Sequence, residues 1–148
     1  MTNEMTEQEW MALGRRAVAC KGWRWMAGML CSGEHYDLLT YEDSTTPRST
    51  DEKIRLQRTK HGHAYISDDC GWVPGDESWP DLRDPATLGC VLALVREAWG
   101  QPGLYALRIG GELWTVSHDR WKHKPYIVGE RTAITEAEAL VTALEQAP

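Results

Sequence analysis

The sequence predicts a single α+β domain in which a twisted antiparallel sheet is packed by about three helices. Three segments carry apolar residues at helical spacing behind an N-capping residue, and two short turns join pairs of strands. Single strands and helices do not alternate as they do around a parallel sheet. At 148 residues, one domain spanning residues 1–148 is expected. The helices would cover one face of the sheet, or both in an α/β/α layering.

The first helix is predicted from Glu7 to Lys21. Thr6 and Glu9 have the Thr-x-x-Glu spacing in which the hydroxyl and the carboxylate each satisfy a free backbone amide. An apolar stripe at helical spacing follows, made of Trp10, Leu13, Gly14 and Ala17, and Gly22 is a suitable stop. Residues 22–30 read as a strand or an ordered loop, and residues 35–41 as one short strand.

A first hairpin is expected around His61-Gly62-His63. A three-residue loop pairs residue 56 with 68 and residue 54 with 70, which brings apolar side chains together on one face. A two-residue loop would oppose Leu56 to Ser67 instead. Hydrophobic registry favours the longer loop. Residues 71–83 carry prolines and acids and are predicted to be a surface connection anchored by Trp72 and Trp79.

The second helix is the clearest element of the sequence. Asp84 is a good N-cap, Pro85 suits the first helical position, and Gly100 is a good stop. The last helix is predicted to begin with a second capping box over residues 135–138 and to expose one face to solvent. Both helices carry apolar stripes that predict packing against a sheet, and Trp99 belongs to the stripe of the second helix.

A second hairpin is predicted on the Gly110-Gly111 turn. The register would pair residue 109 with 112, 107 with 114 and 105 with 116. One face would then hold Tyr105, Leu107, Trp114 and Val116. Residues 126–128 are predicted to form a third strand.

Composition excludes several broad classes. The formal net charge is −6, and eight tryptophans accompany five tyrosines and no phenylalanine. The longest apolar runs fall far short of the ~20 residues that span a bilayer, and residues 1–9 do not resemble a signal peptide. We therefore expect a cytoplasmic protein without membrane contact. The four cysteines, which show no metal or redox spacing, are expected to be reduced thiols: Cys20, Cys31, Cys70 and Cys90.

Catalytic signatures for nucleotide binding, nucleophilic hydrolysis and zinc proteolysis are absent from the sequence, so we expect no cofactor. The best metal candidates are His61 and His63 with Asp69, which have suitable ligand chemistry for a small hydrolase or nuclease. Against this site, the predicted register places both histidines at an exposed hairpin tip, away from the downstream carboxylates. A metal-dependent enzyme is therefore the alternative hypothesis.

A basic segment offers a second alternative, nucleic-acid binding. It contains Arg120, Trp121, Lys122 and Lys124, so an indole that could stack on a base lies among cations that could hold phosphates. The net charge of −6 opposes general affinity for nucleic acid. Exposed, charged strand edges that block unwanted pairing are the simpler explanation of this segment.

Two acidic stretches, residues 34–52 and 68–84, each contain six acids and one base. Such stretches solubilise loops, and they can also dock on a basic groove. Tryptophan is strongly enriched at interface hot spots. Four tryptophans lie in or beside irregular segments and are therefore the predicted partner-binding residues, together with the basic segment: Trp23, Trp25, Trp72 and Trp79.

Three stretches resemble small proteins of tailed phages and prophages, most nearly the phage ABA sandwich domain group. They are Leu13 to Met29 (LGRRAVACKGWRWMAGM), Asp81 to Gly100 (DLRDPATLGCVLALVREAWG) and Ile134 to Ala147 (ITEAEALVTALEQA). The resemblance implies a helix–sheet–helix domain in a phage accessory protein with no assigned catalytic residues. It does not extend to residues 31–80, and it carries over no functional residue.

Taken together, the sequence favours a non-enzymatic phage or prophage accessory protein. Its expected partner is a host or phage protein, through which it would modulate a host process or a defence system.

Overall fold

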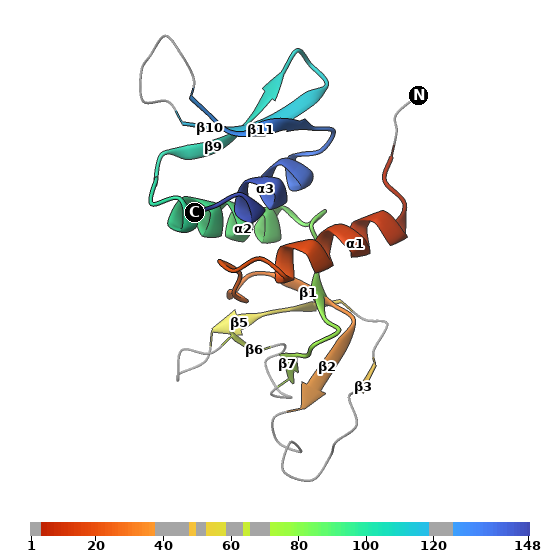
Figure 1. Ribbon diagram of the computed structural model, residues 1–148. Coiled ribbons are helices and arrows are strands. Elements are labelled where there is room, and N and C mark those ends of the chain that lie inside the picture. Colours follow the sequence, from red (N-terminus) through yellow and green to blue (C-terminus); the bar gives the residue numbers. More distant parts are fainter. Residues whose placement is uncertain (1–3, 38–47, 50–52, 59–63, 66–71, 119–125) are drawn as a thin grey trace.

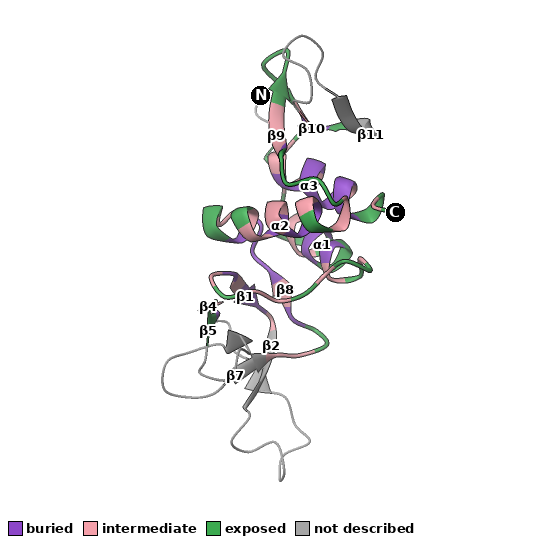
Figure 2. Ribbon diagram, turned by 90° about the vertical axis from the view of Figure 1, so that its left-hand side faces the viewer, coloured by how far each residue is buried: buried purple, intermediate pink, exposed green. Residues whose placement is uncertain are grey.

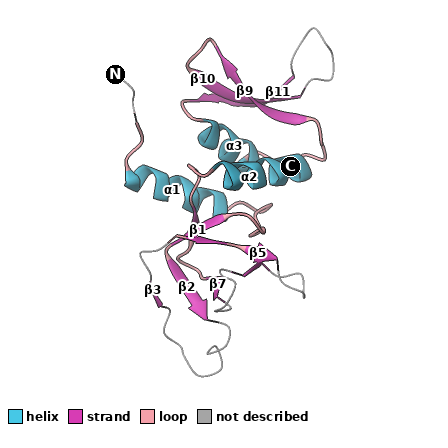
Figure 3. Ribbon diagram, turned by 180° about the vertical axis from the view of Figure 1, so that it is seen from behind, coloured by secondary structure: helices cyan, strands magenta, loops and turns pink. Residues whose placement is uncertain are grey.

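The computed structural model describes residues 4–37, 48–49, 53–58, 64–65, 72–118 and 126–148. Three helices and small antiparallel sheets confirm the predicted α+β class. One sheet lies on one side of the helices and the remaining strands lie on the other (Figure 1 and Figure 3). The described helices are thus the middle layer, whereas an α/β/α arrangement would place them outside. None of these helices is long and apolar enough to cross a membrane.

The helices begin where their capping residues predict. They are α1 (Glu7–Val18), α2 (Pro85–Ala98) and α3 (Glu136–Glu145). The Thr6 cap makes both arms of its capping box. In α3 the Thr135 hydroxyl accepts from the Glu138 amide at 3.1 Å, but the Glu138 carboxylate accepts from the amide of Ile134 rather than from the cap itself. α1 ends three residues before the predicted Lys21.

The upper sheet has the order β11-β10-β9. Its strands are β9 (Leu104–Ile109), β10 (Leu113–His118) and β11 (Tyr126–Ala133), so the third strand is confirmed and is longer than predicted. The predicted hairpin register is wrong by one residue, because Leu113 pairs with Ile109. Glu112 donates its amide to the Ile109 carbonyl at 3.4 Å and stays outside the ladder. The loop is therefore three residues long.

This shift exchanges the faces of the strands, since side chains alternate with a period of two. Trp114 and Val116 share their face with residues 104, 106 and 108 instead of with Tyr105 and Leu107. Leu104 and Val116 are buried in the core, which identifies this face as the one that packs on the helices.

The lower strands form three small antiparallel units, ordered β4-β1-β8, β3-β2-β7 and β5-β6. Their bounds are β1 (Leu30–Ser32), β2 (Glu34–Asp37), β3 (Arg48–Ser49), β4 (Ile54–Arg55), β5 (Gln57–Arg58), β6 (Ala64–Tyr65), β7 (Trp72–Pro74) and β8 (Trp79–Pro80). The segment 71–83 is therefore not the surface connection that we predicted, because it supplies two strands and the buried residues Asp81 and Leu82.

The first hairpin exists, but its predicted register is wrong by two residues. Gln57 pairs with Tyr65 and Arg58 with Ala64. Ile54 pairs instead with Cys31 of β1, and the backbone of Leu56 is bonded to Gly28 and Met29 at 2.8 Å. Ile54 and Leu56, the apolar residues of the predicted strand, thus pair with the segment after α1 and not within the hairpin. The predicted partners at residues 66–70 lie outside the described residues.

The core lies between the helices and the upper sheet and continues past α1 to β1 and β8 (Figure 2). Six residues of α3 are buried, and the Trp99 indole at the end of α2 donates to the Ala143 carbonyl at 2.8 Å. Trp10, Trp99 and Trp114 pack against the core as predicted. α1 contacts both β8 and α3, so it joins the two halves of the core.

Two helical glycines test this packing. A Cβ at Gly14 of α1 would lie 2.9 Å from the Pro80 carbonyl oxygen, whereas a Cβ at Gly89 of α2 would meet nothing within 4 Å. Gly89→Ala should raise the free energy of unfolding by about 0.5–1 kcal/mol through helix propensity. Gly14→Ala should lower it by about 1–2 kcal/mol, because overpacking outweighs the same gain. Urea denaturation followed by circular dichroism measures both. Equal stabilisation by the two variants would contradict the close approach of α1 to β8.

Candidate binding surface

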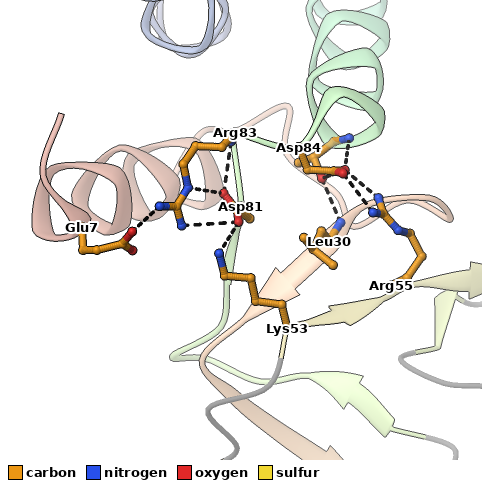
Figure 4. Close-up of polar contacts among 8 residues, drawn as sticks. Glu7, Leu30, Lys53, Arg55, Asp81, Arg83 and Asp84 are labelled. Atoms are coloured by element: carbon orange, nitrogen blue, oxygen red, sulfur yellow. Dashed lines mark hydrogen bonds and ion pairs between the residues drawn. The ribbon is translucent and has the colours of Figure 1, made fainter. Parts of the chain in front are cut away.

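A short acidic segment, residues 81–84, holds the layers together (Figure 4). Asp81 is 4% exposed and binds Lys53 at 2.5 Å and Arg83 at 2.9 Å. Arg83 also pairs with Glu7 in the first turn of α1, and its guanidinium lies 5.9 Å from the ring centroid of Trp10. Burial raises the pKa of Asp81, but hydrogen bonds from Arg83 and Lys53 outweigh it and hold that pKa below its ordinary value.

Asp84 completes this connection at the start of α2. Its carboxylate accepts two hydrogen bonds from Arg55 at 2.6 and 2.9 Å, and one from the amide of Thr87 at 2.8 Å. The Thr87 hydroxyl donates to the same carboxylate and accepts from the amide of Leu30. The bonds from Arg55 lower the pKa of Asp84 to about 2. These contacts fix α1, α2 and the lower strands relative to one another.

Two adjoining clefts lie beside α1 and share Glu4, Met5 and Ile134; together we call them the N-terminal groove. The larger has a volume of about 890 Å³ and reaches Trp10, Arg108 and Leu113. The smaller, of about 320 Å³, runs along α1 to Arg16. The chain rises from α1 toward the upper sheet here (Figure 1). The groove is therefore built between α1, the tip of the β9–β10 hairpin and the start of α3.

Apolar side chains are concentrated at this groove. Among the described residues, the exposed large hydrophobic side chains are Ile109 at 37%, Leu113 at 40% and Ile134 at 56%. Leu113 and Ile134 line the groove, and the half-buried Met5 and Trp10 extend the same surface toward the core. The gathering of exposed apolar side chains at one cleft makes the groove the candidate interaction surface of the described residues.

The tryptophans that we predicted to bind a partner are partly covered where the structure describes them. Trp23 and Trp25 stack edge to face at 5.4 Å and pack against the core. Trp79 is half-buried and lies against α1 at Gly14. These three indoles thus have packing roles, and their part in partner binding stays a prediction. Only the backbone of Trp72 is described, as the start of β7.

The other predicted site residues lie outside the described residues. They are the metal candidates His61, His63 and Asp69, and the basic segment with Arg120, Trp121, Lys122 and Lys124. In the part of the chain that the structure does describe, no group of three or more His, Cys, Asp or Glu side chains could hold a metal ion. Cys20, Cys31 and Cys90 form no disulfide among the described residues, and burial raises the pKa of Cys31 to about 12.

Sequence reasoning missed the N-terminal groove. Ile134 immediately precedes the Thr135 cap, a position where an apolar side chain ordinarily packs onto the first turns of the helix. Its 56% exposure could not be read from that position. The available signal was the hairpin tip, where Ile109 and Leu113 flank two glycines and a glutamate with few apolar partners nearby in sequence.

No family model, curated protein or solved structure matches this chain.

Asp84 provides a test of the acidic segment. Its pKa falls from 3.8 to about 2 on folding, so its ionised form contributes about 2 kcal/mol of stability above pH 4, which is lost as the pH falls toward 2. Asn also caps helices well, so Asp84→Asn removes mainly the charge. Urea denaturation should show the variant to be about 2 kcal/mol less stable at pH 6, with the difference vanishing near pH 2. A difference independent of pH would contradict this role.

Proposed function

We propose that this chain is a non-enzymatic protein that acts by binding another protein through the N-terminal groove. The observation that carries the proposal is the gathering of exposed apolar side chains there: Leu113 and Ile134, two of the three exposed large hydrophobics among the described residues, line one cleft. A few buried residues near the centre of an interface carry most of its binding energy, and truncating one of them costs more than 1 kcal/mol.

The polar groups around the groove support binding rather than reaction chemistry. Glu7 is paired with Arg83, Glu9 accepts from the backbone and hydroxyl of Thr6, and Glu138 accepts from the amide of Ile134. These carboxylates hold helix starts in place. A preformed surface of this kind loses little conformational entropy when a partner docks.

The partner class follows from the resemblance of the helical stretches to tailed-phage and prophage proteins. We propose a protein of the bacterial host or of the phage, and modulation of a host process or a defence system as the outcome. Cytoplasmic location is part of the same proposal. Metal-dependent hydrolysis and nucleic-acid binding remain alternatives that depend on residues outside those the structure describes.

A pair of variants tests the groove. Leu113→Ser with Ile134→Ser removes both exposed anchors, whereas Ile109→Ser removes the exposed cross-strand partner of Leu113, which does not itself line the groove. In affinity capture from bacterial lysate at 0.3 M salt, the wild type and Ile109→Ser should retain the same partner. The double variant should lose it at least ~10-fold, the loss of about 1.4 kcal/mol. Retention by all three proteins, or no salt-resistant partner of the wild type, would contradict the proposal.

A further inference from the structure

Among the described residues around the N-terminal groove, a larger share of the arginines than of the glutamates forms ion pairs. Five glutamates and three arginines line its two clefts. Arg16 is bound to Glu145 by two hydrogen bonds of 2.9 and 2.8 Å, and Arg83 is bound to Glu7 and Asp81. Among the described residues this leaves Arg108 as the one lining cation without an ion pair.

Four lining carboxylates form no ion pair among the described residues: Glu4, Glu9, Glu112 and Glu138. Glu145 raises the pKa of the Arg16 guanidinium, and of these four Glu138 lies near enough to add to that rise. Glu9 stays ionised because hydrogen bonds from the Thr6 backbone and hydroxyl lower its pKa. Because Arg108 is the one lining cation of the described residues that has no ion pair, this described lining carries an excess of negative charge. Its surface is therefore complementary to a cationic partner.

The negative charges flank the apolar side chains. Met5 and Ile134 belong to both clefts, as does Glu4, and these two apolar side chains form the shared middle of the groove. Glu112 lines the larger cleft, and Glu9 and Glu138 line the smaller one, so carboxylates lie on each side of this apolar middle. A ligand that fits must carry apolar groups along its centre and cations along both margins.

An amphipathic helix presents that pattern, with anchors at i, i+3, i+4 and i+7 and basic residues beside them. The groove is lined along α1 from Glu7 to Arg16, nine residues apart, or about 14 Å at 1.5 Å per residue. That length accommodates two to three turns of a docked helix. Arg108 would remain available to a single carboxylate on the ligand.

Resting on the proposed function, we propose that the segment bound in the N-terminal groove is a basic amphipathic helix of the partner protein. Its apolar stripe would cover Met5, Leu113 and Ile134, and its lysine or arginine side chains would face the glutamates.

Synthetic peptides test this chemistry directly with the full chain. The probe is a fluorescently labelled 14-residue peptide of leucine, lysine and alanine with leucines at i, i+3, i+4 and i+7. One control has the same composition scrambled so that no stripe forms, and another has glutamate at every lysine position. Fluorescence anisotropy at 0.15 M salt should show the probe binding at least ~10-fold more tightly than either control. Equal binding of the scrambled peptide would reduce the interaction to charge alone and overturn the helix proposal.

Variants that change the net charge by the same amount test whether the peptide binds in the groove. Glu4→Gln with Glu112→Gln, and Asp76→Lys outside the groove, each make the net charge two units more positive, and all three positions are exposed. The groove variant should weaken the probe by ~3–10-fold, as expected for two exposed charge contacts, and Asp76→Lys should stay within ~2-fold. Equal weakening by both would overturn the proposal. If the lysate partner needs Leu113 and Ile134 but no basic peptide binds, this inference fails while the proposed function stands.

Discussion

The carboxylates of Asp81 and Asp84 connect parts of the chain that are far apart in sequence. Asp81 draws Lys53 and Arg83 together, and Arg83 reaches the first turn of α1. Asp84 caps α2 while it binds Arg55 beside β1. A carboxylate as buried as Asp81 is stable only when such partners compensate its lost hydration. The position of α1, and with it the groove that α1 borders, therefore depends on these ion pairs.

The same ion pairs hold in place the side chains that form the wall of the groove. Arg83 is held by two carboxylates and lies over Trp10, so the wall of the larger cleft is built from side chains whose positions are already fixed. Met5 packs against the core and against Thr135 at the start of α3. Exposed apolar surface costs free energy in the isolated protein. A wall of fixed side chains that does not collapse over Ile134 leaves that surface open, and the docking that we propose would bury it.

The sequence predicted the helix caps and the apolar stripes, which depend on nearby residues, but it did not predict the long-range pairing of strands. Thr6, Asp84 and Thr135 cap helices because each hydroxyl or carboxylate needs only amides two or three residues away. The helical stripes likewise placed Trp10 and Trp99 against the core. The lower sheets were not predicted because Ile54 could pair either with a residue of the nearby hairpin or with Cys31. Only burial in the folded chain favours the pairing with Cys31. The groove escaped for the same reason, since it joins residues 4–16 to residues 108–138.

One inserted residue connects the sheet register to the chemistry of the groove. If the β9–β10 loop held only Gly110 and Gly111, Arg108 would lie on the face opposite Trp114, away from the helices. With Glu112 also in the loop, Arg108 pairs with Trp114 on the helix-facing side and lines the cleft beside Trp10. Glu112 itself adds one of the carboxylates at the margin. The loop length thus places both Arg108, the one lining cation without an ion pair among the described residues, and part of the negative charge of the groove. A change in this loop would alter the charge pattern on which the proposed ligand depends.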